Sequence, residues 1–317
     1  MKIAAPHIAN LIDYASYQGI SEASLRQFLT DPQLDVCKPE NTVNDLEFLE
    51  VFRTLMVKTK DAQLGLHYGC YLNIKALGFI VQLSLNASSI EQAVWVLQEY
   101  LASTFPLVSL SARENNGFYL VQLETTITEE NLKMHLLDTV FCFIYRELKL
   151  MVDDALLPEI QLPYSDLDAY SNLLNTSVQT GNQHVLAFSN RVLKAEINTK
   201  RIREIEALLP KFMMMLNRKK KGYQQFSSQM RNMILNMCCP ELPDFEQVSR
   251  QFPLSDRTIQ RKLTAEGQSF RQIADDIKRE LSFYLAKGNI MKTQDIAYIL
   301  GYSEASAYLH AVRRWEK

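Results

Sequence analysis

Four side chains able to bind nucleic-acid bases recur on one side of a predicted helix near the C-terminus. If Ile259 and Leu263 point into a core, the opposite face presents polar residues at positions i, i+3, i+4 and i+7. These residues are Arg257, Gln260, Arg261 and Thr264. Arginine can donate two hydrogen bonds to guanine O6 and N7, and glutamine can pair with adenine N6 and N7. The spacing therefore predicts a face suited to reading bases in a major groove.

A second segment has the same layout with weaker chemistry. Its predicted inward stripe is Tyr308, Val312 and Trp315. The opposite face carries Ser306, Leu309, His310 and Arg313. Leucine offers only an apolar contact, for instance to a thymine methyl group, and histidine is shorter than arginine and mostly neutral at pH 7. We expect this face to read bases less well than the first.

Both faces belong to an internal repeat. VSRQFPLS (248–255) aligns with IAYILGYS (296–303) at an offset of 48, and the offset becomes 49 after the turn. Ser255 and Ser303 are placed to cap the helices that follow, and the acids Asp256 and Glu304 suit the positive end of a helix dipole. The repeat predicts two helix-turn-helix units, at about 244–266 and 293–315.

A long helix is predicted between the two units. Its apolar stripe is Phe270, Ile273, Ile277, Leu281, Tyr284 and Leu285, all on one face. About 17 residues at roughly 1.5 Å each hold the units some 25 Å apart along its axis. With the width of the units added, the second helices could face successive major grooves of one duplex, roughly 34 Å apart.

The preceding residues predict an α+β domain. Residues 8–104 have helical periodicity, whereas 107–113 and 118–125 alternate as strands around Asn116-Gly117, a pair typical of a tight hairpin. A long helix at 129–151 and strands at 159–164 and 184–189, with a short helix between them, follow. We expect a helical lead, an antiparallel sheet with covering helices, and then an all-α domain.

The predicted domains differ in charge. From residue 217 onward the chain has 17 Lys and Arg against 11 Asp and Glu, a net charge of +6, whereas the earlier residues have 17 against 25, a net of −8. A basic module on an acidic body is typical of a protein whose tail binds a polyanion. We predict an N-terminal domain at 1–212 with a separate role, a linker at 213–227 that includes the basic run 218–221, and a DNA-binding domain at 228–317.

Composition excludes several other classes. A chain of 317 residues with 47% hydrophobic content can bury a core, and it has neither a run of eighteen apolar residues nor a signal peptide. We therefore expect a cytoplasmic protein that does not contact a membrane. Five scattered cysteines without CxxC spacing argue against a disulfide framework or a structural metal site.

The C-terminal region, from RTIQRKLTAEGQSF to YLHAVRRW, resembles the DNA-binding domain of the AraC/XylS family. The resemblance implies base contacts at Arg257, Gln260 and Arg261 in the first unit and at Ser306, Leu309 and His310 in the second. We also expect DNA contacts from Thr264, Arg313, Ser255 and Ser303. LGLHYGCYLNIKALGFIVQLSLNASSIEQAVWVLQEYL resembles the non-cupin sensing domain of the ornithine-utilisation-regulator subgroup. This family resemblance implies that the N-terminal domain at 1–212 senses an effector and dimerises. The implied function is control of transcription, with activation expected, through promoter DNA, RNA polymerase, a small-molecule effector and a homodimer. No cofactor and no metal is implied.

This chain departs from the family pattern in three ways. Pro253 occupies a turn position where the family has glycine, and proline cannot adopt the left-handed conformation, so we expect a different first turn. Leu309 and His310 replace a small polar residue and an arginine. Trp315 is followed only by Glu316 and Lys317, so either this sequence is shortened or the last family helix is absent.

Other functions were weighed against this interpretation. His67, Cys70 and Tyr71, or His135 with Asp138, are residue types used in catalysis, but no hydrolase, phosphate-binding or dinucleotide-binding motif accompanies them. A DNA-alkylation responder requires a zinc-bound cysteine cluster, which Cys37 and Cys70 alone cannot form. Enzyme activity, or haem and gas sensing through a histidine such as His7, is the alternative for the N-terminal domain. A protein-interaction module without DNA binding leaves the repeat unexplained.

Overall fold

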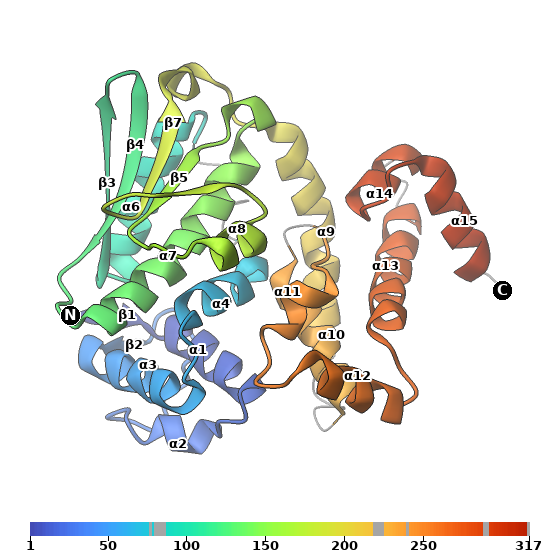
Figure 1. The fold of residues 1–317 in the computed structure, drawn as a ribbon, viewed down its shortest axis with the longest axis horizontal. Coiled ribbons are helices and arrows are strands. Elements are labelled where there is room, and N and C mark those ends of the chain that lie inside the picture. The colour runs from blue at the N-terminus through green and yellow to red at the C-terminus, as the bar shows by residue number, and fades with distance from the viewer. Residues whose placement is uncertain (76–77, 79–86, 218–224, 239–240, 288–291, 316–317) are drawn as a thin grey trace. The chain divides into compact units, whose positions relative to one another are not determined.

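The computed structural model of the chain describes residues 1–75, 78, 87–217, 225–238, 241–287 and 292–315 (Figure 1). The backbone divides into two compact units. The N-terminal unit comprises Met1–Leu72 and Gln82–Asn198, and the C-terminal unit comprises Asn73–Val81 and Thr199–Lys317. Among the described helices, none is both long and apolar enough to cross a membrane.

The N-terminal unit begins with helices and a small sheet that helical periodicity did not predict. The strands β1 (Lys2–Ala4) and β2 (Thr42–Asn44) pair antiparallel, with Ile3 opposite Val43. Asn44 also caps the next helix, since its side chain accepts from Leu46 N at 3.1 Å while Glu47 accepts from Asn44 N at 2.7 Å. The helices of this region are α1 (Ala5–Tyr17), α2 (Glu22–Arg26), α3 (Asp45–Thr59) and α4 (Leu64–Tyr71).

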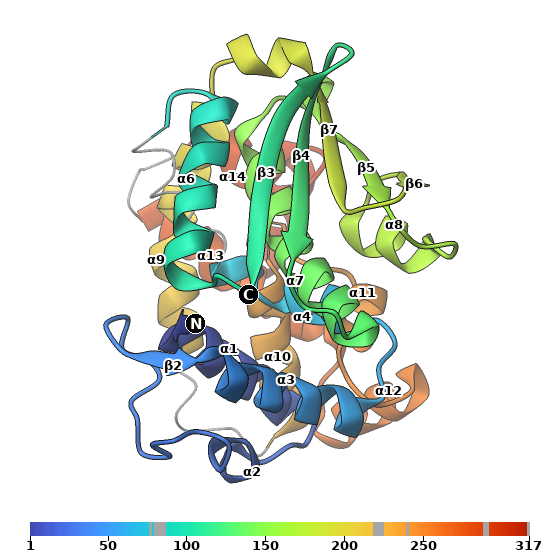
Figure 2. The same cartoon turned by 90° about the vertical axis from the view of Figure 1, so that its left-hand side faces the viewer.

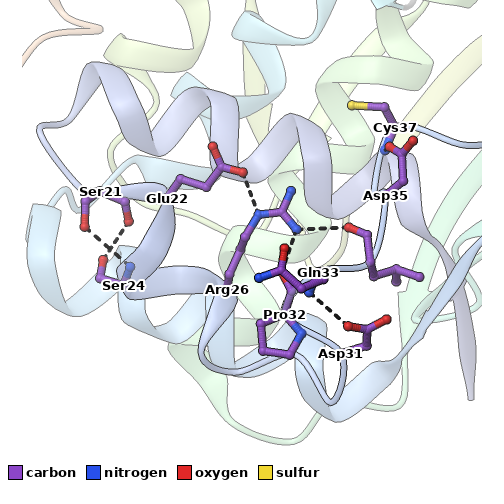
Figure 3. Close-up of polar contacts among 10 residues, drawn as sticks. Ser21, Glu22, Ser24, Arg26, Asp31, Pro32, Gln33, Asp35 and Cys37 are labelled. Carbon is purple, nitrogen blue, oxygen red and sulfur yellow. Dashed lines mark hydrogen bonds and ion pairs between the residues drawn. The ribbon is translucent and has the colours of Figure 1, made fainter.

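Arg26 organises the loop that follows α2 (Figure 3). Its Nε donates to Glu22 at 2.6 Å, and its Nη1 donates to the carbonyl oxygens of Pro32 at 3.1 Å and Leu34 at 3.0 Å. One guanidinium thus satisfies two backbone acceptors that belong to no helix or strand.

A five-stranded sheet forms the second part of the N-terminal unit (Figures 1 and 2). Its order is β3-β4-β7-β5-β6. The strands are β3 (Val108–Asn115), β4 (Phe118–Thr125), β5 (Glu159–Leu162), β6 (Val178–Thr180) and β7 (Val185–Ser189). The predicted hairpin is confirmed, with φ of 47° at Asn116 and 86° at Gly117. The prediction of an antiparallel sheet is only partly right, because β5 and the unpredicted β6 pair in parallel.

Helices α6 (Ile90–Thr104) and α7 (Glu130–Met151) pack against β3 and β4, and α8 (Asp168–Leu174) lies between β5 and β6 in sequence. The predicted long helix is α7, and it also packs tightly on α4. Short 3-10 turns occur at Asp154–Leu156 and Asn190–Lys194. The core of this unit therefore lies between α7, the sheet and the leading helices.

The regular elements among the described residues of the C-terminal unit are α-helices. Its helices are α9 (Thr199–Asn217), α10 (Phe226–Met237), α11 (Phe245–Ser249), α12 (Asp256–Ala265), α13 (Phe270–Lys287), α14 (Thr293–Ile299) and α15 (Ala305–Trp315). The sequence assigned residues up to 212 to the sensing domain, but α9 groups with this unit because it packs on α10 and α13. Glu280 of α13 accepts from Arg231 at 2.6 Å and lies 3.6 Å from Lys211 of α9. The basic run at 218–221 falls outside the described residues.

Four of the five cysteines lie within the described residues. Cys70, Cys142 and Cys238 are buried and Cys37 is exposed, whereas Cys239 lies outside the described residues. The thiol of Cys238 donates to the Ile234 carbonyl at 3.2 Å. Cys238 is thus a core residue at the end of α10.

Candidate nucleic-acid interface

Helices α11 and α12, which lie where the sequence predicts the first helix-turn-helix, are joined by a turn centred on Pro253. Leu254 N donates to the Phe252 carbonyl at 2.8 Å, which closes a three-residue turn that proline accommodates. None of the described residues between α11 and α12 has a positive φ. The expectation that proline alters this turn is therefore confirmed.

Helices α14 and α15, which lie where the sequence predicts the second helix-turn-helix, are joined by a turn that uses glycine. Gly301 has a φ of 76° and donates to the Tyr298 carbonyl at 2.9 Å, while Tyr302 N donates to Ala297 at 2.9 Å. This pair of bonds is the Schellman motif, in which a left-handed residue ends a helix. The two units thus share their helix order but not their turn geometry.

The two predicted helix caps have different outcomes. Ser255 caps α12 as expected, its Oγ accepting from Thr258 N at 3.4 Å. The prediction for Ser303 is wrong by one position, because α15 begins at Ala305 and Glu304 directly precedes it. The extra residue matches the change of offset from 48 to 49 in the repeat.

Helix α12 presents the predicted face to solvent. Ile259 and Leu263 are buried, with 0% and 1% exposure, and anchor the helix in the C-terminal unit. The four polar side chains opposite them, Arg257, Gln260, Arg261 and Thr264, are all exposed. Within the described residues, neither arginine has an ion-pair partner, so both guanidinium groups are available to a ligand. The Thr264 hydroxyl is less available to a ligand, because it already donates a hydrogen bond to the Gln260 carbonyl at 2.9 Å.

Helix α15 also exposes its predicted face, but its buried side differs from the prediction. Ser306, Leu309, His310 and Arg313 are exposed. Tyr308 is buried as expected, whereas Ala311 takes the next buried position. Val312 and Trp315, predicted to point inward, are only half-buried. The buried residues of α15 are thus three positions apart and not four as predicted. The helix is therefore rotated slightly about its axis relative to the prediction.

Three side-chain contacts hold the α14–α15 pair against α13. The hydroxyls of Tyr308 and Ser282 lie 2.8 Å apart in a buried hydrogen bond, and Arg314 donates to Asp275 at 2.8 Å. Lys278 lies 4.8 Å from the Tyr302 ring centroid, a cation–π contact. In Figures 1 and 2, α12 and α14 lie near opposite ends of α13. The sequence did not predict these long-range partners, because no local spacing links residues so far apart in the chain.

Glu266, just after α12, caps the start of α10. Its carboxylate accepts from Phe226 N at 2.7 Å and Ser227 N at 2.8 Å. Burial favours the neutral acid, but these hydrogen bonds prevail and lower the pKa of Glu266 below its usual value. The charge therefore also interacts favourably with the N-terminal end of the α10 dipole.

We expect Glu266→Ala to lower the thermal midpoint of the C-terminal unit at pH 7. Because the folded pKa is depressed, the stabilisation is present above the unfolded pKa and is lost as pH falls through the folded pKa. The difference between variant and wild type should accordingly shrink on acidification, measured by circular-dichroism melts across the acidic range. Glu99→Ala, which removes an exposed carboxylate of α6 with no ion pair among the described residues, is the control; a pH-independent difference for Glu266→Ala would contradict the capping role.

Histidine and cysteine side chains that suggested catalysis or haem binding are buried with local partners. His67 Nδ1 lies 2.6 Å from Asp61 Oδ2, and His135 Nδ1 accepts from Gly65 N at 3.3 Å. Burial lowers the pKa of His7 to about 4. A hydrogen bond from the Cys142 thiol, together with Arg146, lowers the pKa of Cys70 to about 6, but the Cys70 sulfur is fully buried. In the part of the chain that the structure describes, no cluster of three potential metal ligands occurs.

Two further candidates, Tyr71 and Asp138, form hydrogen bonds outside the proposed catalytic pairs. Tyr71 donates to Asp13, and Asp138 accepts from Tyr164 and Tyr170 rather than from His135. His135 and Asp138 therefore do not form a hydrogen-bonded pair.

Comparison with known proteins identifies the N-terminal unit. Residues 21–197 match the family model described as the arabinose-binding domain of AraC transcription regulators, N-terminal. The chain is 22% identical over 282 residues to the HTH-type transcriptional regulator VqsM of Pseudomonas aeruginosa, covering 84% of each chain. It is 29% identical over 75 residues to the ornithine utilization regulator of the same species, covering 24% of this chain and 22% of that protein.

A solved structure, that of the transcriptional regulator CdpR from Pseudomonas aeruginosa, aligns over 98% of this chain and 95% of its own with a TM-score of 0.44 and 18% identity. The matched domain covers more than half of the 317 residues. The chain belongs to the AraC family of DNA-binding transcription regulators that carry this N-terminal domain.

Proposed function

We propose that this regulator binds a specific double-stranded promoter site, with α12 in one major groove and α15 in the next, under the control of a small molecule bound by the N-terminal unit. The observation that carries the proposal is the face of α12, where Arg257, Gln260 and Arg261 are exposed and both arginines lack an acidic partner within the described chain. Such side chains can pair with guanine and adenine edges without first breaking a protein contact.

The α14–α15 pair is proposed to position the protein on DNA more than to select a base sequence. Leu309 and His310 offer one apolar contact and one short polar group, whereas Arg313 suits a phosphate. Ser255 and Ser303 stand near the starts of α12 and α15, where backbone N–H groups and helix dipoles favour phosphate. We further propose a cytoplasmic homodimer that recruits RNA polymerase and activates transcription.

Genomic footprinting with the full-length chain tests the function. We expect an asymmetric protected site with two contact regions about one helical turn, or roughly 10 bp, apart. Fragments recovered without any shared sequence, or protection of a single groove, would contradict binding through both units.

Two neighbouring arginines on α15 are expected to behave differently. Arg313→Ala should weaken binding on all sequences alike and reduce the slope of log affinity against log salt by about 1, because it removes one phosphate contact. Arg314 already pairs with Asp275, so Arg314→Ala should change that slope less. Salt titrations by fluorescence anisotropy on one promoter fragment measure both slopes, and equal slopes for the two variants would contradict the assignment.

A further inference from the structure

A side chain of α7 caps the beginning of α4 in the N-terminal unit, where the two helices lie side by side (Figure 1). Helix α4 starts at Leu64, and the preceding residue, Gln63, gives it no side-chain cap. The first backbone N–H groups of a helix have no partner within the helix. One of them, Gly65 N, donates to His135 Nδ1 at 3.3 Å. His135 therefore supplies the missing cap from another helix.

The cap lies inside a close contact between α4 and α7. A Cβ added at Gly65 would lie 2.7 Å from the His135 Cα, and Thr139 Oγ1 donates to the carbonyl oxygens of Gly65 at 3.2 Å and His135 at 2.8 Å. The His135 residue is only 5% exposed. A donor that loses its acceptor here is left largely without water, which makes the loss costly.

The hydrogen bond to Gly65 requires a neutral imidazole. Because the Gly65 N–H points at Nδ1, this nitrogen carries a lone pair, and the proton of the neutral ring is on Nε2. A second proton would turn Nδ1 into a donor that faces the Gly65 N–H. It would also place a positive charge at the positive end of the α4 dipole. Protonation of His135 therefore replaces an attraction between the two helices by a repulsion.

The surroundings of His135 also disfavour its protonated form. Burial is the main cause that lowers the pKa of His135 below its usual value. The charges of Asp138 on α7 and Asp61 before α4 oppose this shift, whereas His67 on α4 acts in the same direction as burial. Burial prevails, so the ring is neutral at pH 7 and gains its proton only in acid.

We propose that His135 makes the α4–α7 contact an acid-sensitive joint, which is closed while the ring is neutral and loosened when the ring is protonated. The folded pKa lies below the unfolded value of about 6.5, so the stabilisation is fully present above pH 6.5. It is lost as the pH falls from there through the folded pKa. The joint depends on contacts of the N-terminal unit alone and holds whether or not the chain binds DNA.

Hydrogen–deuterium exchange of the full-length chain, read by mass spectrometry on peptides that span α4, tests the joint. After correction for the intrinsic pH dependence of exchange, protection reports the equilibrium constant for local opening. In the wild type this constant should rise by up to about tenfold for each pH unit below 6.5, until the folded pKa is reached. His135→Asn should rise less, because the asparagine Oδ1 can accept from Gly65 N at any pH.

Thr139→Val is the matched control, because it removes the other side-chain hydrogen bond across this contact and has no titratable group. It should reduce protection of α4 by the same factor at every pH, and so keep the wild-type response to acid. An absent acid response in the wild type, an unchanged response in His135→Asn, or a response lost equally in Thr139→Val overturns the proposal.

Nitrogen-15 NMR of the histidine rings in the wild type decides the matter if His135→Asn does not fold. We expect His135 at pH 7 to have its proton on Nε2 and a lone pair on Nδ1, and to titrate below the ordinary value of about 6.5. A proton on Nδ1 at pH 7, or titration at or above that ordinary value, overturns the proposal.

Discussion

Replacing Arg257 or Arg261 by alanine is expected to weaken binding to the specific site by about 1 to 3 kcal/mol each, roughly 5- to 150-fold. Both side chains extend from α12 into solvent, and neither has an acidic partner in the described parts of the chain. The expected loss is therefore one of DNA binding and not of folding, because Ile259 and Leu263 still anchor the helix.

Electrophoretic mobility shifts at fixed salt, on the footprinted fragment and on point-substituted fragments, measure this effect. A base contact predicts that each variant loses discrimination at its own base pair, whereas a phosphate contact predicts uniform weakening. Arg113→Ala, an exposed arginine of β3, is the matched control and should bind as wild type does. Wild-type affinity and specificity in both α12 variants would refute the role of this helix.

Local sequence patterns predicted the elements that depend on near neighbours in the chain. The apolar stripe of α13 predicted its buried side, with Ile273, Ile277, Leu281 and Leu285 all buried. Asn116 and Gly117 predicted their turn because the required positive φ angles restrict residue choice. The spacing of the apolar residues Ile259 and Leu263 likewise predicted which face of α12 is buried and which is exposed.

Long-range features were not predictable from such patterns. The parallel pairing of β5 with β6 depends on a crossover through α8, and three residues of β6 give too little alternation to identify a strand. The hydrogen bond between Gly65 and His135 joins residues 70 positions apart, so spacing gave no signal for it. Likewise, α9 has ordinary amphipathic character, and only its packing on α10 and α13 assigns it to the C-terminal unit.

The largest stability effect is expected at Gly65, where α4 lies closest to α7. Gly65 N donates to His135 Nδ1 at 3.3 Å, and Thr139 Oγ1 donates to the Gly65 carbonyl at 3.2 Å. A Cβ at Gly65 would lie 2.3 Å from the His135 carbonyl oxygen and 2.7 Å from its Cα. These are backbone atoms in the middle of α7, so the clash is relieved only by moving one helix away from the other.

Gly65→Ala is therefore expected to destabilise the N-terminal unit, although alanine favours a helix by about 1 kcal/mol over glycine. Overpacking of this kind costs about 1–3 kcal/mol and more when backbone must shift, so we expect a net loss of about 2 kcal/mol. For a unit of this size that corresponds to a fall in midpoint of roughly 4 to 8 °C.

Thermal unfolding followed by circular dichroism measures the Gly65 effect, with Ala102→Ser as control because it adds one heavy atom at an exposed position of α6. The control should stay within about 0.5 kcal/mol of wild type.

Gly69→Ala provides a second test of the same contact, since its Cβ would lie 2.7 Å from the Cys142 Cβ, a side-chain atom. Because the close atoms at Gly65 are backbone and those at Gly69 include a side chain, Gly65→Ala should be the more destabilising of the two. The reverse order, or a midpoint equal to wild type in both variants, would mean that α4 and α7 are not held together at this closest approach.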